Sequence, residues 1–411
     1  MKRRLALLAA FVVAALFVTS AQAGEKHKIY TLMPHIALSG IVDPSMPDRK
    51  DIDKAWPKKP ADAKKIRIGW TEINQVSDWF IGVRISAEAE AKKYGYELSF
   101  LIADDDANNQ SQHIDTFITQ GVDVIVVDPV NASAPVRDIE RAVAAGIPVI
   151  CSSAVPEDSP ILTTLTANPF MNGFEAGKYI VSKFGKDQQI VATMIAGVMG
   201  SSSTESRLAG VMGGIYYARR AEMGNPYKQV EDAWLDGFNF FEAVKRAGKG
   251  EDASINFVLR GYGIGKWSVE GGLAAGEDLC TANPDMNLMI AENDFMAAGA
   301  VKALKDAGMM DKVVVAAAAD GTVEGMELIK DGDMICTGFN SGYEQGAFVI
   351  DFIKAIFEEG KDPGNLPLGS YFSAGIITKD NVDQYYVEGE KFFKSSGFVY
   401  PKSITDIKAG K

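Results

Sequence analysis

From Ile66 onward, short apolar segments alternate with segments whose apolar residues recur every three or four positions. Ile66–Thr71 is short and mostly apolar, which is typical of a buried strand. The segment after it ends at Gly95 and carries apolar residues at helical spacing: Phe80, Val83, Ala87, Ala91 and Tyr94. This pattern predicts a strand followed by a helix.

The same unit recurs along the chain. Further strands are expected at Leu98–Ile102, Val124–Val127, Pro148–Cys151, Ile190–Ala196, Ile255–Leu259, Leu288–Ala291, Val313–Ala318 and Met334–Thr337. Helices are expected near Gln110–Gln120 and over Asn131–Ala145, the second capped by Asn131 and ended by Gly146. Apolar strands joined by helices form parallel sheets covered on both faces, with right-handed crossovers. The pattern therefore predicts a doubly wound α/β fold.

The first 23 residues have the pattern of a signal peptide. Basic residues 2–4 precede the apolar run Leu5–Val18, and Ala21-Gln22-Ala23 forms a small-residue cleavage site. The run is shorter than the roughly 20 residues of a membrane-spanning helix, and no later segment is long and apolar enough. We expect export with cleavage after Ala23 and no membrane insertion of the mature chain.

Residues 24–64 contain five prolines and no sustained period, which predicts an extended N-terminal arm. The rest of the chain is longer than one hydrophobic core normally serves, so two domains are expected. A binding site could then lie between the two domains.

Composition argues against several classes of function. A net charge of −12 disfavours nucleic-acid and anionic-membrane partners. The three cysteines, Cys151, Cys280 and Cys336, lie in apolar or helical contexts and are expected to be buried free thiols. With three histidines in the chain, a histidine-dependent triad or a histidine-rich metal site is not expected, so we expect no enzyme, no metal and no cofactor.

Two motifs have ordinary structural explanations. Asp104-x-Asp106-x-Asn108 imitates the spacing of a calcium loop, but it lacks the turn glycine and the terminal glutamate, so a strand-to-helix loop is expected. Ser202-x-x-Glu205 has the form of a capping box and predicts a helix start.

Polar residues stand directly after several of the expected strands. In parallel α/β sheets ligands bind outside the carboxyl ends of the strands, where loops and helix N-termini offer side chains and free N–H groups. One such residue alone would be a helix cap or a turn, but several at equivalent positions favour a site. They are Asp128, Ser152, Ser153, Asn293, Asp320 and Asn340.

From about Lys65 to Lys379 the sequence resembles the periplasmic monosaccharide-binding proteins of type I, and its layout is closest to the ribose-binding group. The motifs that carry the resemblance are Trp79-Phe80, Gly146-Ile147-Pro148-Val149-Ile150, Glu205-Ser206-Arg207 with Gly210, Glu292-Asn293-Asp294-Phe295-Met296-Ala297 and Ala319-Asp320-Gly321-Thr322. The resemblance implies two Rossmann-like lobes with parallel sheets, joined by a three-strand hinge and closing on a sugar. Lobe 1 would comprise residues 65–166 and 341–372, lobe 2 residues 167–340 and 373–385, and a C-terminal tail residues 386–411.

The resemblance also implies which residues bind ligand. Trp79 and Phe80 match the aromatic pair of the first lobe, and Trp267 matches the aromatic residue of the opposite lobe. The matching polar positions are Asp128, Arg207, Asn293, Asp320 and Asn340. Ser153-Ala154 stands where ribose-type members carry an Asp-Arg pair, so Ser153 lies at a binding position that has lost its charge.

The identity of the ligand and of the partner stays open at this point. The ligand could be a monosaccharide, a polyol, a modified sugar or another small molecule. The protein would work in the periplasm as a monomer, handing its ligand to a membrane ABC permease. The alternative is that it reports its ligand state to a sensor kinase or chemoreceptor.

Overall fold

The structure is a computed structural model that describes residues 26–33, 35–49, 55–56, 65–386 and 397–411. The predicted signal peptide and parts of the predicted arm and tail lie outside the described residues.

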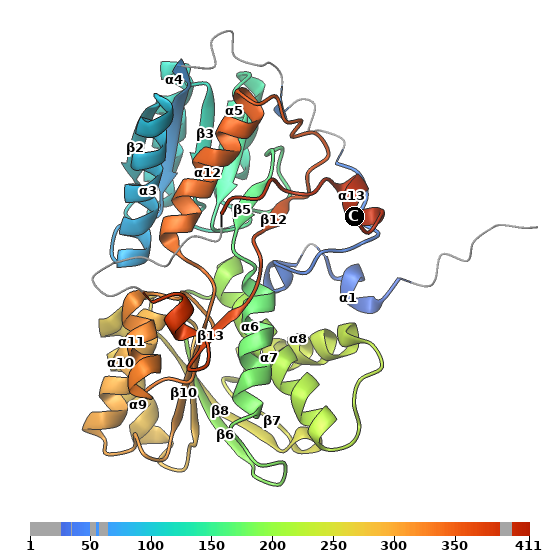
Figure 1. Ribbon diagram of the computed structural model, residues 1–411, viewed down its shortest axis with the longest axis vertical. Coiled ribbons are helices and arrows are strands. Elements are labelled where there is room, and N and C mark those ends of the chain that lie inside the picture. Colours follow the sequence, from blue (N-terminus) through green and yellow to red (C-terminus); the bar gives the residue numbers. More distant parts are fainter. Residues whose placement is uncertain (1–25, 34, 50–54, 57–64, 387–396) are drawn as a thin grey trace, which may run out of the picture.

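Lobe 1 is built on a six-stranded sheet of order β12-β5-β4-β3-β1-β2, in which every neighbouring pair is parallel (Figure 1). Its strands are β1 (Arg67–Glu72), β2 (Glu97–Ile102), β3 (Val124–Val127), β4 (Val149–Ser152), β5 (Thr164–Thr166) and β12 (Gly369–Tyr371). Apolar side chains cover both faces of the sheet. One face packs on α3 (Asp78–Tyr94) and α12 (Gly342–Phe357), and the other on α4 (Ala107–Gln120) and α5 (Val136–Ala144).

Lobe 2 is built on a five-stranded sheet of order β10-β9-β6-β8-β7, parallel except for β7. Its strands are β6 (Ile190–Ala196), β7 (Gly250–Asp252), β8 (Phe257–Ile264), β9 (Leu288–Ala291) and β10 (Val314–Ala317). The helices are α6 (Pro169–Val181), α7 (Ser202–Glu222), α8 (Val230–Ala247), α9 (Val269–Ala282), α10 (Asp294–Asp306) and α11 (Val323–Asp331). The α/β class with parallel sheets is thereby confirmed.

The remaining elements are short. They are α1 (Lys28–Thr31), η1 (Ile36–Leu38), η3 (Ala253–Ile255), η4 (Val382–Gln384), α13 (Ile404–Lys408) and an antiparallel pair made of β11 (Cys336–Gly338) and β13 (Ile376–Thr378).

Two predicted boundaries were wrong because local turns displace them. The helix predicted from Asn131 begins at Val136, since the Asn131 side chain accepts hydrogen bonds from Ser133 and Ala134 N–H in a turn before Pro135. A proline disfavours helical backbone in the residue before it. The strand predicted from Ile255 begins at Phe257, since Asn256 ends a 3₁₀ turn with a left-handed φ of 49°.

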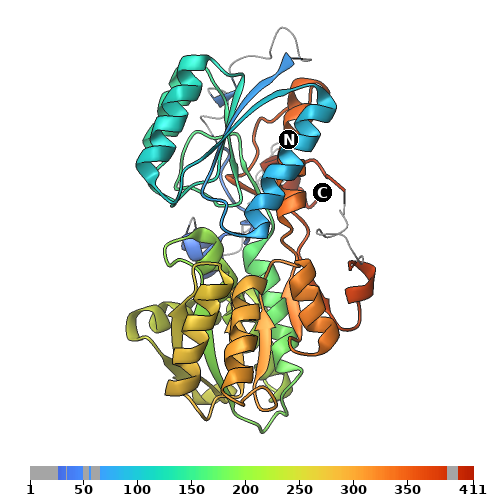
Figure 2. The ribbon, with the colours of Figure 1, turned by 90° about the vertical axis from the view of Figure 1, so that its left-hand side faces the viewer.

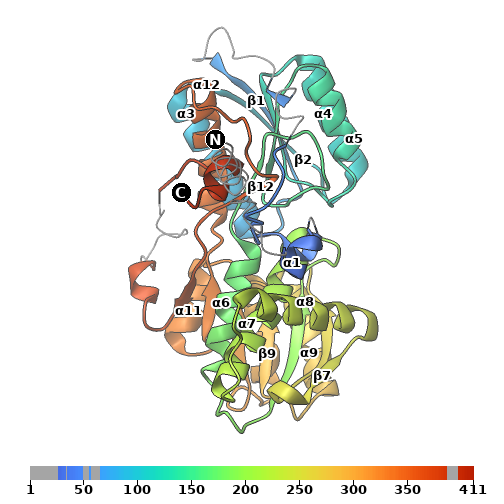
Figure 3. The same ribbon diagram turned by 90° about the vertical axis from the view of Figure 1, so that its right-hand side faces the viewer.

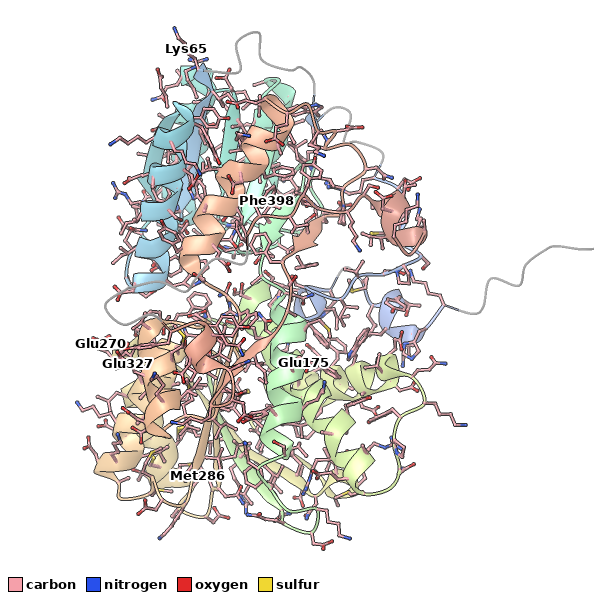
Figure 4. All side chains as sticks on the ribbon, in the orientation of Figure 1. Lys65, Glu175, Glu270, Met286, Glu327 and Phe398 are labelled. Atoms are coloured by element: carbon pink, nitrogen blue, oxygen red, sulfur yellow. The ribbon has the colours of Figure 1, made fainter. Side chains whose placement is uncertain are left out.

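The two sheets point their carboxyl ends at each other. Lys65, just before β1, lies at the outer tip of lobe 1, and Met286, just before β9, lies at the outer tip of lobe 2 (Figure 4). Glu270, near the start of α9, lies at the edge of lobe 2 that faces lobe 1 (Figure 4). Loops that follow the strands of both lobes therefore meet in the gap between them.

Within residues 65–386, three connections carry the chain between the lobes: β5 to α6, β11 to α12, and β12 to β13 (Figure 2). The lobes also touch directly. Val155 N–H of lobe 1 donates to the Ser202 hydroxyl of lobe 2 at 3.0 Å, and Trp79 Nε1 donates to the Asn340 carbonyl oxygen at 2.6 Å. The lobes are therefore closed on each other.

The N-terminal arm is packed against both lobes along one side of the junction (Figures 1 and 3). Ile29, Leu38 and Ile41 are buried in the core of lobe 2. Arg49 donates hydrogen bonds to four carbonyl oxygens of lobe 1, those of Ser159, Ile161, Leu162 and Leu366. The described residues of this segment thus contact both lobes.

The C-terminal tail makes a similar crossing in the described residues. Val382 is buried in lobe 2, whereas Tyr400 stacks on Phe352 of lobe 1 with ring centroids 5.5 Å apart. The last helix also contacts the arm, since Lys408 Nζ lies 2.9 Å from Asp48 Oδ1. Figure 4 shows Phe398 of the tail beside the helices of lobe 1.

Helices α6 and α7 approach so closely that only glycine fits at their contact. A Cβ on Gly173 would overlap the carbonyl group of Arg207, and a Cβ on Gly210 would overlap that of Phe170. This contact fixes the first turns of α7, which carry Arg207.

We expect Gly173→Ala to lower the free energy of unfolding by about 2 kcal/mol, because overpacking at a backbone contact forces the helices apart. Urea titration measures this. Gly185→Ala, where a Cβ meets nothing within 4 Å, is the control and should leave stability within about 0.5 kcal/mol of the wild type. Equal stability of the two variants would contradict the packing argument.

Candidate functional site

A cavity of about 50 Å³ lies between the lobes, at the carboxyl ends of the strands. All nine residues predicted to bind ligand line it, although binding by any of them stays a prediction. They are Trp79, Phe80, Asp128, Ser153, Arg207, Trp267, Asn293, Asp320 and Asn340. Residues far apart in the sequence and on separate sheets therefore face one small space.

The first turn of α3 supplies the aromatic wall of lobe 1. The rings of Trp79 and Phe80 are nearly perpendicular, at 89°, with centroids 5.1 Å apart. Consecutive helical residues point in different directions, so the pair presents one ring face and one ring edge to the cavity. The Trp79 indole is held by its hydrogen bond to the Asn340 carbonyl oxygen.

Two buried carboxyl groups lie side by side behind this wall. Asp128 is fully buried, and neither of its carboxyl oxygens receives a well-formed hydrogen bond. Glu72, at the end of β1, accepts hydrogen bonds from Trp70 Nε1 at 3.1 Å and Ile73 N–H at 3.0 Å. Burial, followed by the charge of Glu72, raises the pKa of Asp128 well above its usual range, and burial also raises the pKa of Glu72. The two carboxyl groups therefore resist being ionised together.

Lobe 2 contributes one guanidinium group, that of Arg207 on α7. Its Nη1 lies 3.1 Å from Glu292 Oε1, and its Nη2 lies 3.9 Å from Asp320 Oδ1. Glu292 also accepts hydrogen bonds from Trp267 Nε1 at 2.9 Å and from Gly197 N–H. Arg207 Nε has no hydrogen-bond partner among the described residues, so the guanidinium keeps donor capacity.

Asp320, at the end of the β10 segment, is held by two amides. Asn340 Nδ2 donates to it at 2.8 Å and Asn293 Nδ2 at 3.1 Å. Burial raises the pKa of Asp320, and the charge of Arg207 opposes this rise. Asn293 also caps α10 by accepting from Met296 N–H, so one residue both starts the helix and orients the carboxylate.

Two of the lining residues hold left-handed backbone without being glycine. Ser153 has φ 59° and Trp267 has φ 55°. Such conformations cost on the order of 1 kcal/mol and concentrate where the surrounding structure fixes a functional side chain.

Sequence reasoning missed Glu72 and Glu292. Both stand at the carboxyl end of a strand, so the rule that found Asp128 and Asn293 would have found them had it been extended to the last strand residue. The remaining lining residues that were not predicted are Ile73, Ser77, Ala154, Ser201 and Ser203.

The capping-box prediction was wrong in its detail. Helix α7 has Ser201 at its N-cap, and the Ser202 hydroxyl accepts the interlobe hydrogen bond from Val155. Glu205 Oε1 accepts from Gly200 N–H at 3.0 Å.

A larger groove of about 1010 Å³ lies between the arm and the two lobes. It contains none of the nine predicted residues, and its lining mixes apolar side chains with charges of both signs. It therefore has less of the convergent polar chemistry of a binding site than the interlobe cavity.

Within the described residues there is no group of three or more histidine, cysteine, aspartate or glutamate side chains that could hold a metal ion. Cys151, Cys280 and Cys336 are buried and not in disulfides. None of the described helices combines the length and the hydropathy needed to span a membrane.

Residues 68–362 match the family model described as a periplasmic binding protein domain. The chain belongs to the periplasmic binding protein family. The resemblance carried by the sequence motifs is thereby confirmed, together with the type of fold that it implied.

Two curated relatives are named for different ligands. The chain is 25% identical over 283 residues to the ribose import binding protein of Bacillus subtilis, covering 69% of this chain and 79% of the relative. It is also 25% identical over 317 residues to the xylitol-binding protein of Mycolicibacterium smegmatis, covering 77% and 78%.

Solved structures agree with the fold. An ABC transporter solute binding protein from Mycobacterium smegmatis with bound glycerol matches with a TM-score of 0.64 at 23% identity, over 80% of this chain and all of that one. One from Bacillus halodurans with bound myo-inositol matches with a TM-score of 0.62 at 20% identity, over 79% and 98%.

A buried carboxyl group behind the site gives a pH prediction. Burial, followed by the charge of Asp320, raises the pKa of Asp294 to about 7. An aspartate in an unfolded chain has a pKa near 3.9, so between these values the folded protein binds the extra proton and stability falls as pH rises. We expect the wild type to lose on the order of 1 kcal/mol per pH unit from this group between pH 5 and pH 7.

Asp294→Asn should remove that part of the pH dependence in urea titrations. Asp306→Asn, at the exposed end of the same helix, should keep it. The explanation fails if the wild type and Asp294→Asn lose stability at the same rate over this interval.

Proposed function

We propose that this protein is the periplasmic substrate-binding component of an ABC-type importer, and that it binds a monosaccharide or related polyol between its lobes. The observation that carries the proposal is the interlobe cavity of about 50 Å³, where aromatic rings and planar polar groups from both lobes converge. The relatives named for ribose import and for xylitol binding support the same ligand class.

The lining suits a polyhydroxylated ligand. The C–H faces of a sugar pack on aromatic rings such as Trp79 and Trp267, while carboxylate, amide and guanidinium groups exchange paired hydrogen bonds with adjacent hydroxyls. A micromolar complex needs about 8 kcal/mol, and hydrogen bonds to charged groups contribute about 1.5–3 kcal/mol each before ordering costs. Arg207 and Asp320, with stacking, are sufficient without a metal.

Ligand entry requires the lobes to separate. The closed cavity of about 50 Å³ has room for only a few water molecules, and the Val155–Ser202 hydrogen bond closes one edge of the gap. Rotation about the three hinge connections would open the cavity, and ligand binding would favour the closed form.

The closed form would then dock on a membrane permease, with the protein acting as a monomer in the periplasm after cleavage at Ala23. The names of the import relatives support a transporter rather than a sensor as partner. Co-purification with a permease rather than with a sensor ectodomain tests this choice.

The ligand class is tested by native mass spectrometry of freshly purified protein, followed by a thermal-shift screen of sugars, polyols, amino acids and small acids. Stabilisation by sugars or polyols is the expected result. Stabilisation by amino acids alone would overturn the ligand class while leaving a solute-binding role.

For a sugar or polyol found in this way, we expect Arg207→Ala to weaken binding at least tenfold by calorimetry, because the variant loses a buried donor and leaves Glu292 without its cation. Arg220→Ala, at the far end of the same helix, is the control and should bind as the wild type does. Unchanged affinity in Arg207→Ala, with the fold intact by circular dichroism, would remove Arg207 from the site.

A further inference from the structure

We propose that the ligand carries a protonated amino group, as in an amino sugar or amino polyol, and that this group binds beside Asp128. The inference rests on the proposed binding of a polyhydroxylated ligand in the interlobe cavity and narrows its class.

The charges around the cavity do not balance. Two buried carboxyl groups line it, those of Asp128 and Asp320, with Glu72 and Glu292 next to them, and Arg207 is the sole cationic side chain among its described lining residues. On lobe 2 the two carboxylates share the guanidinium and accept further hydrogen bonds from Trp267, Asn293 and Asn340. Lobe 1 supplies no cationic side chain to the described lining, so Asp128 lacks the neighbour that Asp320 has in Arg207.

Asp128 is the carboxyl group of lobe 1 that lines the cavity. Its side chain is fully buried, lines the cavity, and has no well-formed hydrogen bond at either oxygen. Glu72, Ser153 and Ala154 lie next to this carboxyl group but give it no well-formed hydrogen bond, so it is suited to a donor that arrives with the ligand. An ammonium group offers three donors and a charge, whereas a hydroxyl offers one donor and no charge.

The walls next to Asp128 also favour a cation. Trp79 and Phe80, on the same lobe, form a perpendicular aromatic corner that lines the same cavity. Aromatic faces attract ammonium groups, most strongly where water is excluded. The rings of Trp79 and Phe80 and the carboxyl group of Asp128 thus both favour an ammonium group in the ligand.

The raised pKa values of Glu72 and Asp128 give a distinctive readout. A cation beside Asp128 stabilises the ionised form of both carboxyl groups, so an amine ligand should displace a proton on binding. The titratable or charged groups around Asp128 are Glu72 on β1, Cys151 on β4, and Arg207, Glu292 and Asp320 across the cavity.

The experiment compares matched ligands by calorimetry at pH 7: D-glucose with 2-amino-2-deoxy-D-glucose, D-glucitol with 1-amino-1-deoxy-D-glucitol, and xylitol with its 1-amino-1-deoxy analogue. We expect the amine to bind at least tenfold more tightly in one or more pairs. Titrations in two buffers of different ionisation enthalpy should show proton release for the amine and none for the hydroxyl analogue.

The variants Asp128→Asn and Glu72→Gln should each abolish or reduce the amine preference, measured as the ratio of amine to hydroxyl affinity within the same variant, together with the proton release. Asp138→Asn, another buried carboxyl group of lobe 1 outside the cavity, should preserve both. If either Asp128→Asn or Glu72→Gln fails to fold, the other variant still tests the inference.

Binding of sugars or polyols without an amine preference would overturn the inference and leave the proposed function standing. Amine preference that persists in both Asp128→Asn and Glu72→Gln would also overturn it. If no member of either series binds, the proposed ligand class and this inference fail together.

Discussion

The direction of the strands is the constraint on which the rest of this structure depends. Parallel strands place the ends of all their connecting loops at one edge of a sheet, and here two sheets present that edge to each other. Asp128 and Asn293, which are distant in the sequence and belong to different sheets, thereby reach one cavity. Helix starts reach it as well, so Trp79 and Arg207 enter from the first turns of α3 and α7. The order and direction of the strands alone therefore bring these residues to one cavity.

Placing so many carboxyl groups in so little space has an electrostatic consequence. Lobe 2 resolves it with hydrogen bonds and one guanidinium, since Glu292 and Asp320 share Arg207 and accept from indole and amide donors. Lobe 1 has no cation in the cavity lining, and burial raises the pKa of both Glu72 and Asp128. The two halves of the cavity therefore differ. The carboxylates of lobe 2 accept hydrogen bonds from the protein itself, whereas Asp128 of lobe 1 keeps acceptor oxygens for the ligand.

Much of this arrangement could be predicted from the sequence, and the failures have physical causes. The strands Ile190–Ala196 and Leu288–Ala291 were predicted to the residue, because buried parallel strands are apolar without interruption. The start of α5 was predicted too early, because the Asn131 side chain accepts a hydrogen bond from Ser133 N–H in a turn and does not cap the helix. Glu72 was missed although it directly follows the predicted strand Ile66–Thr71, because the sequence does not show that Asp128 of another strand lies beside it in the interior. The docking of the arm on both lobes has no periodic signature, since Ile29, Leu38 and Ile41 enter a core formed by other elements.

The position of Arg49 bears on the order in which the chain folds. Its guanidinium is bonded to backbone carbonyl oxygens of Ser159, Ile161, Leu162 and Leu366. The last of these is separated from Arg49 by most of the chain, so this contact has very high sequence separation and its loop closure is slow. Arg49 can therefore bond to residues 159–162 early, but it reaches its full set of partners only once the chain extends to Leu366.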